Sequence, residues 1–161
     1  MYLGPIFPKN LYAGAVQCSY PSRNDIKGGD FQDPQKFLIR GNIQFISTSD
    51  TMYSNRAVFF PYSASSLSLS TTRTLAAAID GSVKWTMSVW AKAGTDSYRP
   101  SFRMRATDTI GAQSISNRFG LSTDWNRYHF TGKFTGVAGN KSLKVELGVS
   151  TGNGNIYFSG W

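Results

Sequence analysis

Apolar and polar residues alternate along much of the chain from residue 84 onward. Every second position is apolar in residues 84–91, and the same period of two recurs in residues 102–107, 127–134 and 143–149 and around Ile156 and Phe158. This period is typical of a strand that buries one face, so the pattern predicts five half-buried strands. It assigns the following residues to the space between two sheets: Trp85, Met87, Val89, Tyr128, Phe130, Leu143, Val145 and Leu147.

Shorter apolar runs upstream predict further strands at residues 35–40, 42–46, 57–61 and 66–70. Segments suited to tight turns, such as 93–96, 136–140 and 151–155, separate the later strands. Only residues 72–79 suit a helical turn, which Gly81 would end. Eight or nine short strands without intervening helices favour an all-β fold, a two-sheet antiparallel β-sandwich of the jelly-roll type.

The first 27 residues differ from the rest of the chain. They are interrupted by Pro, Gly, Asn and Ser and have no clear period, yet they carry more apolar side chains than a disordered tail does. We therefore expect an extended N-terminal arm over residues 1–27, followed by a jelly-roll domain over residues 28–161. The arm must bury its apolar side chains either on its own domain or on a neighbouring subunit. The residues expected to make such a contact are Tyr2, Leu3, Ile6, Phe7, Leu11 and Tyr12.

The formal net charge is +8, from 17 Lys and Arg against 9 Asp and Glu, and favours an acidic partner. The basic residues are dispersed along the sequence, with Arg103 and Arg105 the tightest pair, and no zinc-binding spacing or RNA-binding aromatic signature accompanies them. We therefore expect an acidic protein surface rather than a specific nucleic acid as partner. No window of 18 apolar residues predicts a membrane span, and residues 1–14 lack the features of an export signal, so we expect the protein to act where it is made.

Few residues suit acid–base or nucleophilic catalysis. His129 is the only histidine, and it falls on the strand face opposite Tyr128 and Phe130 without a recognisable nucleophile or orienting carboxylate. Cys18 is the only cysteine, so no disulfide forms within the chain. Eight of the nine carboxylates stand in turn-like contexts, where Asp serves backbone hydrogen bonding. The sequence therefore predicts a protein that is not an enzyme and needs no cofactor.

Three acidic residues, Asp25, Asp30 and Asp33, surround Gly28 and Gly29. They fit two interpretations, either oxygen ligands of a structural calcium near Asp30 or ordinary turn caps. The spacing is not that of an EF-hand loop, and we expect turn caps and no metal site.

Trp90 lies on the face of its strand opposite Trp85, so the two indoles cannot share one core layer. Trp90 then lies either beneath the N-terminal arm or on a glycan-binding or intersubunit surface, since sugar faces stack on flat rings. The same two interpretations apply to Tyr53, Phe59, Phe60 and Tyr62. Our candidate glycan or interface aromatics are Trp90, Tyr53 and Tyr62.

Several segments resemble the jelly-roll carbohydrate-binding modules of families four, nine and twenty-two. They are KGGDFQ at 27–32, SLSL at 66–69, WTMSVWAKA at 85–93, LSTDWNRYHF at 121–130 and NIYF at 155–158, in the order and with the spacing of that family. The resemblance implies a jelly roll over residues 28–161. The family's calcium site uses an acidic residue of the opening motif and an aspartate of the closing strand. Those positions hold Gln32 and Ser159 here, which departs from the family's metal site.

The setting implied by the sequence differs from that of a module attached to a secreted glycosidase. Small jelly rolls made without an export signal resemble the head-decoration, or cement, proteins of tailed bacteriophages and the modules of their tail fibres. Our leading hypothesis is a virion structural protein on the capsid exterior, assembled in the host cytoplasm, which forms a dimer or trimer and binds the major capsid protein through its arm and basic surface. The alternative is a carbohydrate-binding module of the tail-fibre or adhesion type that recognises cell-surface glycans.

Overall fold

The computed structural model describes residues 29–52, 54–74, 84–94, 100–108, 113–133, 142–150 and 155–161. The predicted arm with its six contact residues lies outside the described residues, as do Cys18, Asp25 and Tyr53. Across the described ranges no helix is long and apolar enough to cross a membrane.

Short strands make up most of the described chain. One short 3-10 helix, η1 (Pro34–Lys36), precedes the strands β1 (Leu38–Arg40), β2 (Gln44–Ser47), β3 (Arg56–Phe60), β4 (Leu67–Thr74), β5 (Lys84–Ala93), β6 (Ser101–Asp108), β7 (Gln113–Ile115), β8 (Phe119–Gly120), β9 (Asn126–Lys133), β10 (Ser142–Val149) and β11 (Ile156–Ser159).

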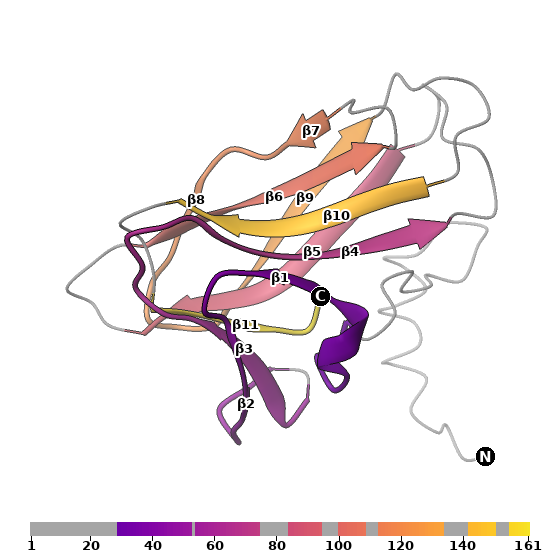
Figure 1. The fold of residues 1–161 in the computed structure, drawn as a ribbon. Coiled ribbons are helices and arrows are strands. Elements are labelled where there is room, and N and C mark those ends of the chain that lie inside the picture. The colour runs from indigo at the N-terminus through magenta and orange to yellow at the C-terminus, as the bar shows by residue number, and fades with distance from the viewer. Residues whose placement is uncertain are drawn as a thin grey trace, which may run out of the picture.

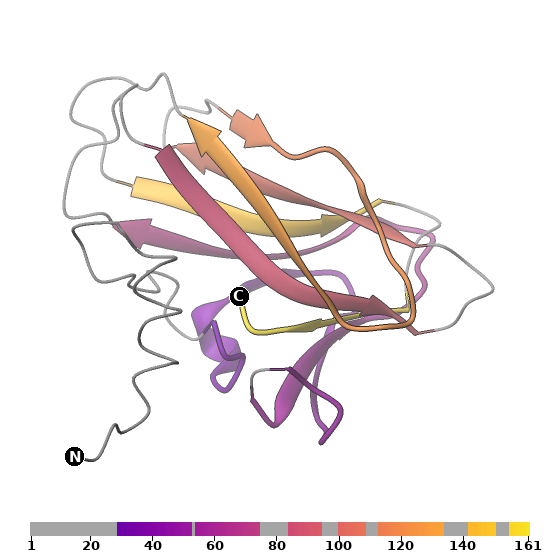
Figure 2. The same cartoon turned by 180° about the vertical axis from the view of Figure 1, so that it is seen from behind.

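The strands form two antiparallel sheets that pack face to face. One sheet has the order β1-β4-β10-β6-β7, with β8 also paired to β6, and the other has the order β2-β3-β11-β5-β9. Figure 1 shows β4, β10 and β6 in front of β5 and β9, and Figure 2 shows β5 and β9 in front, crossing the first sheet at an angle. The predicted two-sheet jelly roll is confirmed.

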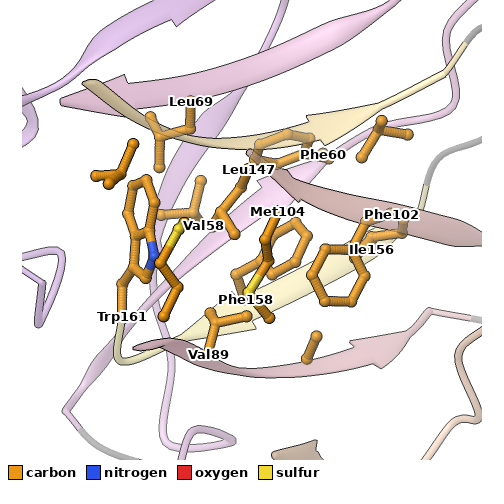
Figure 3. Close-up of a cluster of buried hydrophobic side chains, with 14 of the residues drawn as sticks. Val58, Phe60, Leu69, Val89, Phe102, Met104, Leu147, Ile156, Phe158 and Trp161 are labelled. Carbon is orange, nitrogen blue, oxygen red and sulfur yellow. The ribbon is translucent and has the colours of Figure 1, made fainter. Parts of the chain in front are cut away.

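The core lies between the sheets, where alternate residues of both sheets meet (Figure 3). Of the residues predicted to be buried there, Met87, Val89, Leu143, Val145 and Leu147 are all at most 5% exposed. Tyr128 and Phe130 are half-buried and pack against this core, while the side chain of Trp85 is outside the described part. The period-two pattern therefore assigned the inner faces of β5, β9 and β10 correctly.

Two local predictions were wrong. Residues 35 and 36, expected to begin the strand at 35–40, belong to η1 instead, because the Asp33 carboxylate accepts a hydrogen bond from the Gln35 backbone N–H at 3.1 Å and Pro34 suits the first turn. Residues 72–74, expected in a helical turn, continue β4 and pair with β10, since β-branched residues favour an extended backbone when a partner strand is available. The short strands β7 and β8 were not predicted.

Candidate functional site

The outer face of the five-stranded sheet gathers aromatic side chains from distant parts of the sequence. In β5 the core-facing residues Met87, Val89 and Ala91 alternate with half-buried Trp90 and Lys92, which therefore face outward. In β11 Tyr157 lies between buried Ile156 and Phe158 and faces outward for the same reason. We call this surface the aromatic face, defined by Phe59, Trp90, Trp125 and Tyr157.

Strand pairing places Tyr157 at the centre of the aromatic face. Its register partners are Phe59 on β3 and Lys92 on β5. The rings of Phe59 and Tyr157 stack with centroids 4.7 Å apart and planes inclined by 27°, and both side chains are half-buried. Since neighbouring strands lie about 4.8 Å apart, the stack is held by the backbone of the sheet itself. It places two partly exposed apolar rings side by side on the outer face of the sheet.

A charged pair lies beside this stack. The Asp50 carboxylate accepts a hydrogen bond from the Lys92 ammonium with one oxygen and from the Trp125 indole N–H, at 2.8 Å, with the other. The Lys92 Nζ lies 5.2 Å from the Trp125 ring centroid and 5.7 Å from that of Tyr157. Such distances place the ammonium within cation–π range of both rings. The two rings, the ammonium and the carboxylate therefore form one connected cluster.

The pKa of Asp50 is lowered, first by the hydrogen bond from the Lys92 side chain and second by that from the Trp125 indole. A carboxyl with a lowered pKa stays ionised near neutral pH and accepts hydrogen bonds. Asp50 is therefore suited to bind a hydroxyl donor and not to deliver a proton.

Trp90 occupies the next row of the aromatic face. Its register partners are Ser159 on β11 and Arg127 on β9. The Arg127 guanidinium donates a 2.9 Å hydrogen bond to the Ser88 hydroxyl. Ser88 is also the cross-strand neighbour of the exposed His129. The prediction that Trp90 lies outside the core between the sheets is confirmed.

Tyr62 and Tyr53 are the other two candidate aromatics predicted from the sequence. Tyr62 is 59% exposed and lies two residues beyond β3, where its backbone N–H donates to the Asn155 side chain at 3.3 Å. Tyr53 lies outside the described residues. The sequence analysis missed Asp50, Lys92, Trp125 and Tyr157 as site residues. Alternation in β5 and β11 was a usable signal for Lys92 and Tyr157, whereas no local signal marks Asp50.

The residues at the family's calcium position do not fit a metal ion. Calcium needs several oxygen ligands, usually including carboxylates. The Gln32 side-chain amide instead donates to the Asn55 side chain at 2.9 Å, and the Arg56 guanidinium lies 3.4 Å from the Gln32 carbonyl oxygen. The buried Ser159 hydroxyl accepts from the Met52 backbone N–H at 3.1 Å. A guanidinium this close to the Gln32 carbonyl oxygen would repel a bound cation.

Carboxylates near this position serve the backbone, as expected of turn caps. Asp30 accepts from the Gln32 backbone N–H at 3.2 Å, and Asp33 caps η1. In the part of the chain that the structure describes, no three His, Cys, Asp or Glu residues gather in a way that could hold a metal ion. Asp50 differs from the turn role expected for it, because its carboxylate bridges Lys92 and Trp125 instead.

The fold is similar to that of solved carbohydrate-binding modules. The TmCBM61 module in complex with beta-1,4-galactotriose aligns over 86% of this chain and 95% of its own, with a TM-score of 0.65 and 15% identity. The CBM22-1 xylan-binding domain of Paenibacillus barcinonensis Xyn10C aligns over 78% and 83%, with a TM-score of 0.56 and 11% identity. The enzymatically active domain of tailspike protein 4 of bacteriophage CBA120 aligns over 84% of this chain and 20% of its own, with a TM-score of 0.56 and 15% identity.

No protein-family model and no curated protein sequence matches the chain. At identities this low, the structural similarities establish a shared jelly-roll fold of the carbohydrate-binding-module type.

Proposed function

We propose that this protein is a non-enzymatic carbohydrate-binding module and that its aromatic face binds a glycan. The observation that carries the proposal is the Phe59–Tyr157 stack beside the Asp50–Lys92–Trp125 cluster. A sugar ring has an apolar C–H face and a rim of hydroxyl groups. Aromatic side chains suit the apolar face, and the carboxylate and ammonium suit the hydroxyl rim.

The polar groups of the cluster are already held in place before a ligand arrives. Lys92 is only 17% exposed, and it is fixed by Asp50 and by two aromatic rings. Binding a glycan then requires little further ordering of these side chains, which lowers the entropy cost of association. The cluster is therefore better suited to recognition than an equal number of mobile surface side chains.

The same geometry favours binding over catalysis. Glycoside hydrolases of the usual design use two carboxyl groups about 5 to 9.5 Å apart, one of them an acid with a raised pKa. The pKa of Asp50 is shifted in the opposite direction by Lys92 and Trp125. A site with an ionised acceptor and stacked rings supports retention of a glycan without its cleavage.

The similar modules suggest which glycans to test first. One was solved with beta-1,4-galactotriose and another is a xylan-binding domain. The natural ligand class to test is therefore a neutral, linear plant-type or bacterial polysaccharide, beginning with beta-1,4-galactan and xylan.

The test is affinity gel electrophoresis against this panel, followed by titration calorimetry with oligosaccharides of the retained polymer. Tyr157→Ala should weaken binding at least about tenfold, because truncating a central aromatic contact commonly costs more than about 1.4 kcal/mol. Leu38→Ala is the matched control, since Leu38 is 68% exposed on the outer face of the other sheet. Retention of full affinity in a Phe59→Ala/Tyr157→Ala double variant, or no retention of the wild type by any neutral glycan, would refute the proposal.

The comparisons favour this alternative over our leading hypothesis of a capsid cement protein. The similar structures named above are two carbohydrate-binding modules and a tailspike domain, so binding to a major capsid protein and oligomer formation stay predictions. The similarity to a domain of a bacteriophage tailspike is compatible with glycan binding in a phage tail. Immunogold labelling of purified particles would test that setting, with label at the tail expected and label over the capsid shell contradicting it.

A further inference from the structure

The outer face of the six-stranded sheet has a different chemistry from the aromatic face. Arg40, Arg103, Arg105 and Lys144 occupy outward positions on β1, β6 and β10, and Glu146 is the one carboxylate among them. Four cations against one carboxylate leave a net charge of +3. We call this surface the basic face, defined by these five residues. Within the described ranges it carries no aromatic side chain.

The basic face has a row of small residues between two arginines. Register pairs Arg40 with Ser68, Ser68 with Gly148, and Gly148 with Arg103. Three strand spacings of about 4.8 Å put the two arginine backbones about 14 Å apart. A Cβ added at Gly148 would meet only the Glu146 carboxylate, at 3.6 Å, so the space above this glycine is open. Both arginines are exposed, and neither has an ion-pair partner among the described residues.

The neighbouring row is only partly neutralised. Glu146 lies 3.7 Å from the Arg105 guanidinium and 3.6 Å from the Lys144 ammonium. One carboxylate is therefore shared between two cations. The side chains of Arg105 and Lys144 remain 42% and 43% exposed. Together with Arg40 and Arg103 they form a surface with an excess of positive charge.

We propose that the basic face is a second binding surface, for a linear polysaccharide that carries carboxylates, a polyuronate. Guanidinium groups match carboxylates through two parallel hydrogen bonds. Ser68 lies in the row between Arg40 and Arg103, and Thr72 and Thr107 flank Lys144 on the same face. Each of these hydroxyls can both donate to and accept from sugar hydroxyls. An open row flanked by arginines lets an extended chain lie across the strands.

The composition of the basic face disfavours the other polyanions. Proteins that bind single-stranded nucleic acids stack bases on aromatic side chains, and this face carries none among the described residues. A flat sheet face does not enter a duplex groove as a helix or ribbon does. Protein interfaces are enriched in aromatic residues, Met and Arg, and of these only Arg occurs on the described part of this face. Its exposed apolar surface comes from Leu38, which is 68% exposed.

The test is titration calorimetry of the full chain with polygalacturonate, using fully methyl-esterified polygalacturonate as the chemical control. The two polymers share a backbone and differ in the carboxylate charge. We expect binding of the acid form that weakens as ionic strength rises, because exposed charges are screened over about 8 to 10 Å. Binding of the methyl ester with equal affinity would overturn the proposal.

Variants locate the surface. Arg40→Gln and Arg103→Gln should each weaken binding about tenfold, as expected for the loss of a charge-assisted hydrogen-bonded contact. Arg127→Gln removes the same charge from the opposite sheet and is the matched control, with a change of less than about twofold expected. Glu146→Gln should strengthen binding several-fold, because it frees Arg105 and Lys144. Thermal melting confirms that each variant is folded.

Two results would overturn the proposal, the first through its assignment to this face and the second through its ligand. One is an equal loss of affinity in Arg127→Gln and Arg103→Gln, which would mean that net charge alone attracts the polymer. The other is tighter binding of dextran sulfate or duplex DNA than of polygalacturonate, each lost with the same arginines. The proposal does not rest on the aromatic face, because Tyr157→Ala should leave polyuronate binding unchanged while it weakens binding of a neutral glycan.

Discussion

Replacing Phe102 by alanine should remove the contact that most directly joins the two sheets. Phe102 belongs to β6 in one sheet and is 1% exposed. Its ring lies edge-on to two rings of the other sheet, with centroids 5.0 Å from Phe158 and 5.4 Å from Tyr128. Phe119 lies 5.3 Å away on its own side. Figure 3 shows Phe102 close to Phe158 and Ile156 within the core.

The expected cost follows from burial and from these ring contacts. A buried Phe replaced by Ala costs about 3 to 5 kcal/mol, from lost transfer free energy and the remaining cavity. Edge-to-face aromatic pairs add about 0.5 to 1.5 kcal/mol beyond burial. Phe102 makes two such pairs across the sheets, so we expect a loss in the upper half of the range, about 4 to 5 kcal/mol. The whole free energy of unfolding of a single domain is about 5 to 15 kcal/mol.

The assay is equilibrium unfolding in urea followed by tryptophan fluorescence, with the slope of free energy against denaturant compared between variants. Phe59→Ala is the internal control, because Phe59 is half-buried on the aromatic face and should cost only about 1 to 1.5 kcal/mol. If Phe102→Ala does not fold, Phe102→Leu should still fold with a loss of about 1 to 2 kcal/mol. A loss below about 2 kcal/mol for Phe102→Ala, or one equal to that of Phe59→Ala, would show that this ring does not join the sheets as described.

Two further predictions concern a turn and the charged cluster. Gly41→Ala should destabilise the fold by about 1 to 3 kcal/mol in thermal or urea unfolding, because Gly41 has φ +90° and an added Cβ would collide with buried Leu67. Gly120→Ala is the control and should be nearly neutral, because the space around an added Cβ is open there. Equal losses of stability in the two variants would contradict this account. Asp50 has a lowered pKa in the folded state, so the stability it contributes should be complete above its ordinary value of about 3.9 and should be lost as pH falls through the lowered pKa. The stability difference between the wild type and Asp50→Asn should accordingly shrink on acidification, and a difference that grows as pH falls would reverse the sign of the argument.

The fold was predictable because alternation is a local property. In β5 and β10 every second residue is apolar, and a period of two fixes which side chains enter the core whatever strand lies beside them. The 3-10 turn at Pro34–Lys36 and the extension of β4 through Thr74 depend instead on a cap and on a partner strand. Those features were missed because the apolar pattern carries no information about either.

The candidate site was only partly predictable because it depends on the order of strands. Alternation placed Trp90 outside the core, but Tyr157 meets Phe59 and Lys92 only because β11 lies between β3 and β5. Asp50 reaches Trp125 across 75 positions of sequence, through a loop that follows β2. No periodicity predicts that β11, the last strand, is inserted at the centre of a sheet. The residues that sequence reasoning missed are those brought together by that insertion.

The same reasoning changes how the dispersed basic residues should be interpreted. Arg40, Arg103 and Lys144 are far apart in sequence, which argues against a basic binding segment but not against a basic surface. In an antiparallel sheet, outward positions of strands distant in sequence become neighbours about 5 Å apart. The order β1-β4-β10-β6 brings these three residues onto one face, with hydroxyl-bearing residues and Gly148 between them. Period-two alternation gives each strand one outward side whose residues can vary without disturbing the core. The outward side of one sheet carries aromatic rings and a fixed ion pair, and that of the other carries arginines and a lysine that share one carboxylate.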